Sequence, residues 1–224
     1  MQNKQRHSGD PLSHSMTDLM TSLAVIFILL LVCYMNQNFE DTQRGSHNRL
    51  LALKNKIDAG LKVKNIECEY DEKKDPLSCT VRVRDKHLSF DTGADQIKPT
   101  GQDFLKWLGP RLTGIICSPE YKKDVESVFI QGFTDSRDTD ENNLSLSQNR
   151  SFAVMKYTLN NTNLLKQERD CLLNVASTNG RGERDLVYTN KKENQDASRR
   201  VEFKIRVKSV EQRQQMKAVE QSVE

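Results

Sequence analysis

The sequence predicts a single transmembrane helix followed by an α/β (α+β) sandwich domain in which helices pack on a sheet. An uncharged apolar run, Leu19 to Met35, stands near the start of the chain, and about 17–25 apolar residues are enough to cross the hydrocarbon core of a bilayer. After this run, segments with an apolar period of two alternate with segments whose apolar residues lie three or four apart. This alternation is typical of strands interleaved with helices.

The length and charge of the chain limit its organisation and its partners. Its 224 residues suffice for one span and one domain of ordinary size. The 34 basic and 31 acidic residues nearly balance, and no long basic run occurs, so we expect no direct contact with nucleic acid. We expect a tail over 1–15, the membrane helix over 16–36, an amphipathic linker or plug helix over 37–62, a hairpin over 63–85, the sandwich domain over 86–208 and a C-terminal tail over 209–224.

The sequence gives little support for an enzyme. Its four histidines have no metal-ligand spacing, and the chain contains no nucleophile motif. We therefore expect no catalytic residue, no bound metal and no cofactor. The histidines are His7, His14, His47 and His87.

One carboxylate, Asp18, stands at the start of the apolar run. An ionised carboxylate in a bilayer costs about 2.5–3.5 kcal/mol, so such residues tend to face a partner or water and to carry function. The alternative is an N-terminal cap or first-turn acid that interacts favourably with the helix dipole. Ser13, Ser15 and Thr17 can also cap, so both interpretations of Asp18 stay open.

The elements of the domain follow from the apolar period. Val201 to Val207, VEFKIRV, alternates strictly and predicts a strand. The residues after Lys208 are rich in Glu, Gln and Lys and predict a short helix or disorder. The other expected elements are a short strand at Leu88–Phe90, a helix at Pro99–Leu112, a strand at Val125–Phe133, a helix at Leu144–Leu159, a partly helical connection over 160–174 and a strand at Val175–Thr178.

The linker carries a helical stripe of four apolar residues: Leu50, Leu53, Ile57 and Leu61. Residues three or four apart lie on one face of a helix. That face either pairs with another copy of the chain or lies on the chain's own domain. The sequence leaves both interpretations open.

Four cysteines follow the apolar run, an even number that suits an oxidising compartment. Cys68 and Cys79 flank a turn-like stretch, and both flanks have strand character. A hairpin would bring these two thiols together and would leave Cys117 to pair with Cys171. The alternative is four free thiols.

The region around Asp18 resembles the start of MotB-type stator proteins. The shared pattern is Pro11, six residues, Asp18-Leu19-Met20-Thr21-Ser22 and then an apolar run. In that family the aspartate binds and releases the ion that crosses the membrane, so the resemblance assigns this role to Asp18, with a proton or a sodium ion as the translocated ion. The linker of that family can plug the ion path. Met16-Thr17 stand where the family often has an aromatic residue.

A second block resembles the OmpA-like peptidoglycan-binding module over about residues 86 to 208. Its motif is Gly132-Phe133-Thr134-Asp135, followed by Asn143, Leu146-Ser147 and Arg150 at the family spacing. The flanking motifs Leu88-Ser89-Phe90-Asp91, Ile97 to Gly101, Gly180-Arg181-Gly182-Glu183 and Arg199-Arg200-Val201-Glu202 also match in order. Asp138 and Ser151 depart from the family, which usually has Gly and Ala there.

The resemblance implies a site for diaminopimelate, a zwitterion of the peptidoglycan stem. Asp135 would accept hydrogen bonds from its amine, and Arg150 would bind its carboxylate with the planar guanidinium. Thr134, Asn143 and Leu146 would line or brace the pocket. The alternative is a salt bridge between Asp135 and Arg150 that only ties the loop.

This ligand also implies the location of the chain. Basic residues lie on both sides of the apolar run, so their count does not decide its orientation. Peptidoglycan lies in the periplasm, which places the C-terminal domain there. The resemblance therefore implies a single-pass protein of the cell inner membrane with a cytoplasmic N-terminus.

The assembly is implied by the stator resemblance as well. A lone span with a carboxylate cannot form a channel, because polar groups in lipid need protein or water around them. MotB-like proteins act as a homodimer within a ring of a MotA-like membrane protein. The short tail and the residues around Asp18 most resemble the ZorB family of the Zorya antiphage defence system, whose ring partner is ZorA. The alternatives are a flagellar MotB-type motor stator and a passive peptidoglycan anchor.

Overall fold

The computed structural model describes the backbone of residues 11–223, and it describes the side chains of residues 19–35 and of most residues from 45 to 221. The chain divides into two compact units, Met1–Arg44 and Gly45–Glu224. Helix α1 (Pro11–Leu61) begins in the first unit and ends in the second. The backbone of Asp18 belongs to this helix, but its side chain lies outside the described residues.

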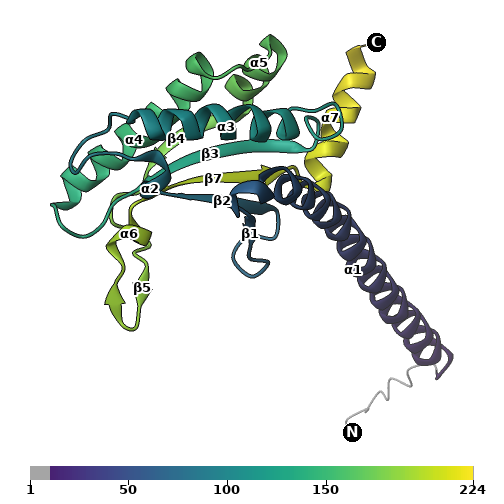
Figure 1. Cartoon of the computed structure of the whole chain (residues 1–224). Helices are drawn as coiled ribbons and strands as arrows, with labels where there is room; N and C mark the ends of the chain where they lie inside the picture. Colours follow the sequence, from purple (N-terminus) through teal and green to yellow (C-terminus); the bar gives the residue numbers. More distant parts are fainter. Residues whose placement is uncertain (1–10, 224) are drawn as a thin grey trace, which may run out of the picture. The chain divides into compact units, whose positions relative to one another are not determined.

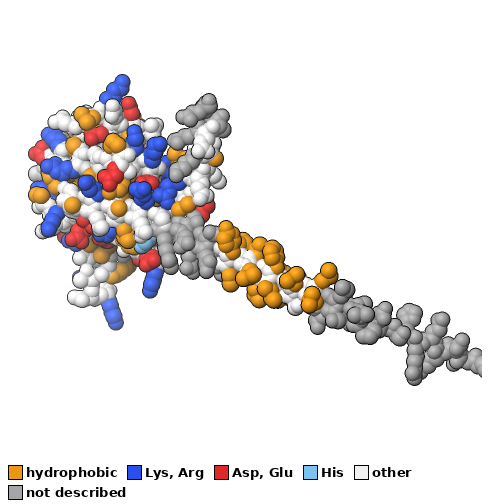
Figure 2. Space-filling model, turned by 90° about the vertical axis from the view of Figure 1, so that its right-hand side faces the viewer, with side chains coloured by type: hydrophobic (Ala, Val, Ile, Leu, Met, Phe, Trp, Pro, Cys, Tyr) orange, Lys and Arg blue, Asp and Glu red, His pale blue; other side chains and the backbone are white. Residues whose placement is uncertain are grey.

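The described part of the first unit is apolar on its surface. The side chains from Leu19 to Met35 are exposed along α1 (Figure 2), and the large apolar ones are 47% to 72% exposed. Within the described residues, no helix reaches the combination of length and hydropathy that a bilayer crossing requires.

The second unit is built around a five-stranded sheet of order β1-β2-β7-β3-β4 (Figure 1). Strands β3 and β4 are parallel, and the other neighbours are antiparallel. Two very short strands, β5 and β6, form a separate hairpin. The strands are β1 (Cys68–Tyr70), β2 (Ser78–Arg84), β3 (Val125–Phe133), β4 (Ala176–Gly180), β5 (Tyr188–Thr189), β6 (Lys192–Glu193) and β7 (Arg200–Val207).

Three helices, α3, α4 and α5, lie over one face of this sheet (Figure 1). The alternation of β7 explains why, because Val201, Phe203 and Ile205 are buried on one face and the charged residues between them lie on the other. The helices that follow α1 are a 3-10 turn (Lys62–Lys64), α2 (Asp85–Leu88), α3 (Pro99–Ile116), α4 (Asp140–Asn161), α5 (Lys166–Val175), α6 (Gln195–Ser198) and α7 (Val210–Val223).

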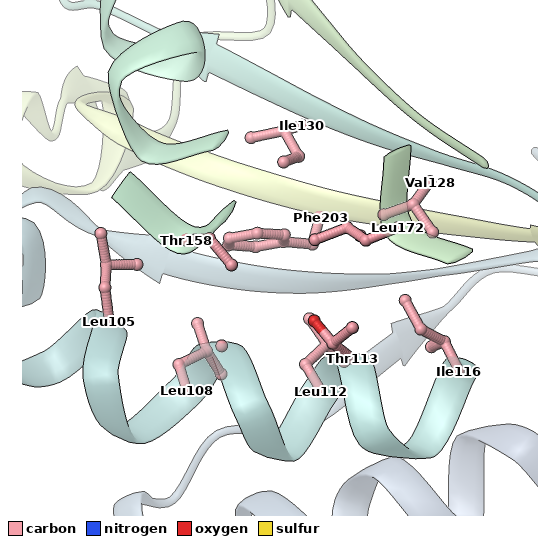
Figure 3. Close-up of a pocket in the computed structure, with 11 residues that line it drawn as sticks. Leu105, Leu108, Leu112, Thr113, Ile116, Val128, Ile130, Thr158, Leu172 and Phe203 are labelled. Atoms are coloured by element: carbon pink, nitrogen blue, oxygen red, sulfur yellow. The ribbon is translucent and has the colours of Figure 1, made fainter. Parts of the chain in front are cut away.

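The core between these helices and the sheet is closely packed. Figure 3 shows Leu105, Leu108 and Leu112 of α3 pointing toward side chains of β3 and β7. The cavity that they line measures about 10 Å³, which is barely the space of one water molecule. This cavity is therefore part of the core and is too small to bind a ligand.

The apolar stripe of the linker belongs to the same core. Leu50, Leu53, Ile57 and Leu61 are all 0% exposed and pack with the residues of the sheet and of α3. The stretch from Gly45 to Leu61 therefore lies on its own domain, which is one of the two interpretations that the sequence left open.

Two expected elements differ in the structure. The hairpin expected to precede the domain forms β1 and β2 of its central sheet, so no boundary separates the two. The strand expected at Leu88–Phe90 is absent, because α2 ends at Leu88 and Ser89 has a left-handed φ of 53°. Phe90 makes only an isolated bridge to Ile97. Two other expectations agree with the structure, because the partly helical connection over 160–174 contains α5 and the C-terminal tail forms the helix α7.

Both expected disulfides are present, which confirms the predicted pairing. Cys68 bonds to Cys79 with their Cα atoms 5.6 Å apart, across the β1–β2 hairpin. Cys117 bonds to Cys171 at 6.0 Å and joins the end of α3 to α5. Cys33 is free and exposed.

The two disulfides should differ in their contribution to stability. The Cys117–Cys171 bond spans 54 residues and the Cys68–Cys79 bond spans 11, so loop-closure entropy predicts losses of about 4 and about 3 kcal/mol when each is removed. The measurement is the free energy of unfolding in urea of the two paired Cys→Ser variants, with Cys33→Ser as the control that should behave as wild type. A larger loss for the shorter loop, or four alkylatable thiols in the native protein, would contradict this prediction.

Candidate functional site

The candidate site lies where β3 ends and α4 begins. Helix α4 starts at Asp140, and the Thr139 hydroxyl caps it by accepting a hydrogen bond from the backbone N–H of Asn142. Gly132 in β3 faces the backbone of Ser147 in α4 so closely that a Cβ atom would lie 2.0 Å from the Ser147 carbonyl oxygen. The Ser147 hydroxyl in turn accepts from the N–H of Gly182 at 2.9 Å. These contacts fix α4 against the ends of β3 and β4.

Asp135 lies two residues after the end of β3, and its side chain is 7% exposed. It accepts hydrogen bonds from Nε of Arg137 at 2.9 Å and from Nη1 of Arg199 at 2.7 Å. Burial raises the pKa of Asp135, but the hydrogen bonds from these two arginines outweigh burial and hold the pKa below its ordinary value. Asp135 is therefore a fully charged acid with two basic partners.

Arg150 lies in the middle of α4 and is 3% exposed. Its Nε donates to the carbonyl of Ala94 at 2.9 Å and its Nη2 to that of Asp91 at 3.0 Å. Its guanidinium carbon lies 4.8 Å from the centre of the Phe90 ring. Arg150 makes no ion pair with Asp135 in the described part of the chain, so the salt bridge considered as an alternative is not the interaction that holds either residue.

The other three predicted residues surround this junction in different ways. Thr134 is 3% exposed, and its hydroxyl oxygen is buried without a hydrogen-bond partner in the protein. Nδ2 of Asn143 donates to the carbonyl of Asp138 at 3.0 Å and to Oε2 of Glu183 at 3.2 Å, which braces the turn before α4. Leu146 is half-buried on α4. The side chain of Asp138 accepts from Asn142 and from the N–H of Thr139, so this departure from the family supports the same turn.

Two charged residues that the sequence did not single out as site residues also lie here. Arg199 donates to Asp85, Asp135 and Asp196, so it joins three acids from different elements. In the sequence, Arg199 was named only as part of a family motif and was given no role of its own. Asp85 follows β2 at the start of α2, and no motif includes it. Burial raises the pKa of Asp85, against the lowering influence of the charges of Arg150 and Arg199.

A hollow of about 440 Å³ lies beside this cluster of charges. Asp85 and Arg199 line this hollow, whereas neither Asp135 nor Arg150 does. Within the described residues no group of three His, Cys, Asp or Glu side chains has the arrangement of a metal site. The hollow is lined by Arg84, Asp85, Lys86, Ser89, Phe90, Asn194, Asp196, Ala197 and Arg199.

The fold is an OmpA-like α/β domain, which is the class that the sequence motif predicted. Helices cover one face of its sheet, and a charged junction lies between β3 and α4. The OmpA family matches residues 89–200, half of the chain, and the protein belongs to the OmpA family. This membership supports the expectation that the protein is not an enzyme.

The chain is similar over most of its length to curated relatives. It is 24% identical to Zorya protein ZorB of Escherichia coli (strain Crooks), over 85% of this chain and 86% of that protein. It is 27% identical to Zorya protein ZorB of Escherichia coli O139:H28, over 90% and 84%. These similarities confirm the predicted resemblance to ZorB.

One solved structure supports the fold of the second unit. The crystal structure of a MotB-like protein from Desulfovibrio vulgaris matches with a TM-score of 0.53 at 22% identity, over 74% of this chain and 99% of that one. At this identity the match supports the fold alone.

The close approach of α4 to β3 should tolerate no side chain at position 132. The substitution Gly132→Ala would push a methyl group into the backbone of Ser147, and we expect a loss of about 1–3 kcal/mol in the free energy of unfolding. Gly45→Ala is the control, because its Cβ would meet only Val210 at an ordinary 3.6 Å. Equal urea midpoints for the two variants would show that this contact does not position α4.

Proposed function

We propose that the protein is an inner-membrane stator subunit that is anchored to peptidoglycan and couples ion flow to motion together with a ring-forming partner. Similarity to ZorB over 85% or more of the chain supports this role, because it extends well beyond the residues 89–200 that match the OmpA family. The similarity also supports a function in antiphage defence. The observation that carries the anchoring function is the cluster of charges at the β3–α4 junction.

The charges at this junction suit a diaminopimelate-containing ligand. Asp135 and Arg150 are both buried, and neither is neutralised by the other. Within the described part of the chain Arg150 has backbone carbonyls and no ion pair, and a buried charge without an ion pair is costly and marks a functional site. Thr134 adds an unpartnered hydroxyl, and Asn143 and Leu146 brace the helix that carries Arg150. We assign the binding of the peptidoglycan stem to these five residues.

The membrane part of the proposal rests on the apolar side chains of α1. A continuous exposed apolar surface is unstable in water and marks an interaction with a membrane or a partner. The side chains from Leu19 to Met35 form such a surface. A single membrane helix here, with a cytoplasmic N-terminus, leaves the OmpA domain in the periplasm, where peptidoglycan and disulfides both occur.

The ion-coupling part of the proposal rests on Asp18. At the start of the apolar segment, a carboxylate can take up and release a proton or a sodium ion, provided that a partner surrounds it. We propose a homodimer within a ring of a ZorA- or MotA-like membrane protein as that surrounding. The membrane potential supplies about 2.3 kcal/mol per charge per 100 mV for each cycle. A flagellar motor stator and a passive anchor are the competing functions.

Anchoring should depend on both charged residues of the junction. Asp135→Ala and Arg150→Ala each remove a charged hydrogen-bonding group, and we expect each to weaken retention on isolated cell walls by about tenfold or more. Sedimentation of the purified full chain with peptidoglycan sacculi measures this. Asp103→Ala and Arg111→Ala are matched controls, because both residues are exposed on α3. Unchanged retention of both site variants, with intact circular dichroism, would disprove the anchoring site.

Ion coupling should depend on the charge of Asp18. Asp18→Asn keeps the size of the side chain and removes its ionisation, so we expect loss of ion flux and of phage protection when the protein is expressed with its ring partner. Retention on sacculi should not change. Asp10→Asn, eight residues earlier, is the control. Ion flux that survives Asp18→Asn would favour the passive anchor.

A further inference from the structure

Helix α7 is attached to the rest of the domain by polar contacts. Among the side chains of α7 that the structure describes, none is buried and none belongs to the apolar core. A surface helix is ordinarily held by an apolar stripe that faces the core. In α7, by contrast, Nε2 of Gln212 donates to Oε1 of Glu126 at 3.0 Å, and Arg213 makes further polar contacts. Lifting α7 would therefore remove no buried apolar side chain of its own from the core.

The start of α7 is stabilised within the helix itself. The Ser209 hydroxyl accepts a hydrogen bond from the N–H of Gln212 at 3.3 Å, and the Gln212 side chain accepts from the N–H of Ser209 at 2.8 Å. This reciprocal pair is a capping box. The residue before it, Lys208, is held by the domain, because its N–H donates to the carbonyl of Asp124 at 2.8 Å. Ser209 is thus the joint between a fixed strand end and a separately capped helix.

Arg213 joins α7 to two other parts of the domain. Its Nη2 donates to the hydroxyl of Ser46 in α1 at 2.8 Å, and its Nη1 donates to Oδ1 of Asp124 at 3.2 Å. Oδ2 of Asp124 lies 3.8 Å from Nη1 of Arg49, which is also in α1. The side chains of Arg213 and Asp124 are 20% and 13% exposed, so both are largely shielded from water. This pair of charges therefore connects α7 to α1 and to the residue before β3.

The turn of α1 that α7 contacts lies before the apolar stripe. The stripe begins at Leu50, and the second unit of the chain begins at Gly45. Ser46 is 1% exposed, although Asn48 on the same turn is exposed. Besides the bond from Arg213, a Cβ atom at Gly45 would lie only 3.6 Å from the side chain of Val210. Helix α7 thus covers the place where α1 enters the domain (Figure 1).

Strand β1 holds the same turn of α1 without the help of α7. The Tyr70 hydroxyl and Nδ1 of His47 lie 3.0 Å apart, within hydrogen-bond distance. Tyr70 is the last residue of β1, which the Cys68–Cys79 disulfide ties to β2. The turn therefore stays attached to the domain on one side when α7 is lifted.

We propose that α7 is a releasable strap across the first turn of α1 in the domain. In the closed form, Arg213 covers Ser46 and binds Asp124. In the open form, α7 turns about Ser209 and Ser46 becomes accessible, while the β1 contact and the apolar stripe still hold α1. The strap sets how firmly α1 is clamped where it enters the domain. This device goes beyond the proposed function and does not depend on what the domain binds.

The reactivity of a thiol at position 46 measures opening of the strap. Ser46→Cys and Asn48→Cys are each made in a Cys33→Ser background, and the full chain in detergent is labelled with a maleimide without reductant. Because the strap covers position 46 and leaves position 48 exposed, we expect labelling at 46 to be about tenfold or more slower. Equal rates at the two positions would show that the closed form does not exist.

Removal of the Arg213 side chain should open the strap and leave the core intact. We expect Arg213→Ala to speed labelling at position 46 by about tenfold and to leave the rate at position 48 unchanged. Gln215→Ala is the matched control, because Gln215 is exposed on the same helix, and it should change neither rate. An unchanged rate at position 46 in Arg213→Ala would overturn the proposal.

Two further measurements separate local opening from unfolding of the domain. Leu53 is 0% exposed beneath the same helix, so Leu53→Cys should stay unlabelled when it is combined with Arg213→Ala. The urea midpoint of Arg213→Ala alone should stay close to that of wild type, and this measurement requires no change in the core. Labelling at position 53 as fast as at position 46, together with a lowered midpoint, would show that α7 is a fixed part of the domain.

Discussion

The site depends on the close contact between α4 and the ends of two parallel strands. Gly132 allows the backbone of α4 to approach β3, and Ser147 accepts a hydrogen bond from Gly182 just after β4. Gln148, the next residue, accepts from the N–H of Gly180 at 2.6 Å. Helix α4 is thus tied to both strands over a single turn. Arg150 lies two residues further along α4 and donates to the carbonyls of Asp91 and Ala94 in the loop that precedes α3.

The charged residues around this contact contribute more to positioning the side chains of the site than to the stability of the domain. Removing ions from water costs several kcal/mol each, and their mutual attraction often does no more than offset that cost. Arg199 reduces the cost by sharing its donors among Asp85, Asp135 and Asp196. The oxygen of Asp85 and the hydroxyl of Thr134 remain buried and unpaired. A domain selected for stability alone would lose such groups, whereas a binding site retains them.

The sequence predicted the site better where a motif fixed the spacing than where a short pattern had to be interpreted. Strand β3 has the predicted bounds, and the structure places Asp135 after β3 and Arg150 in α4. Asp85 was missed because no motif includes it. The short helix α2 that it begins was also missed, because the three residues Leu88 to Phe90 cannot distinguish a strand from the end of a short helix. The left-handed backbone of Ser89 decides this in the structure. The hydrogen-bond partners of Asp135 and Arg150 could not be predicted from the sequence either, because several charged residues lie nearby and tertiary contacts decide which of them pair.

The apolar stripe of the linker is another short pattern that the sequence alone could not interpret. An apolar stripe specifies a buried face but not the surface that covers it, and only the structure assigns Leu53 and its neighbours to their own domain. Their burial makes the last turns of α1 part of the core, and Asp58 reinforces this by accepting from the N–H of Cys68 at 2.6 Å. From there the Cys68–Cys79 disulfide ties β1 to β2, which pairs with β7 next to β3. The last turns of α1 are therefore connected to the β3–α4 junction through the Asp58 hydrogen bond, the disulfide and the paired strands of the sheet.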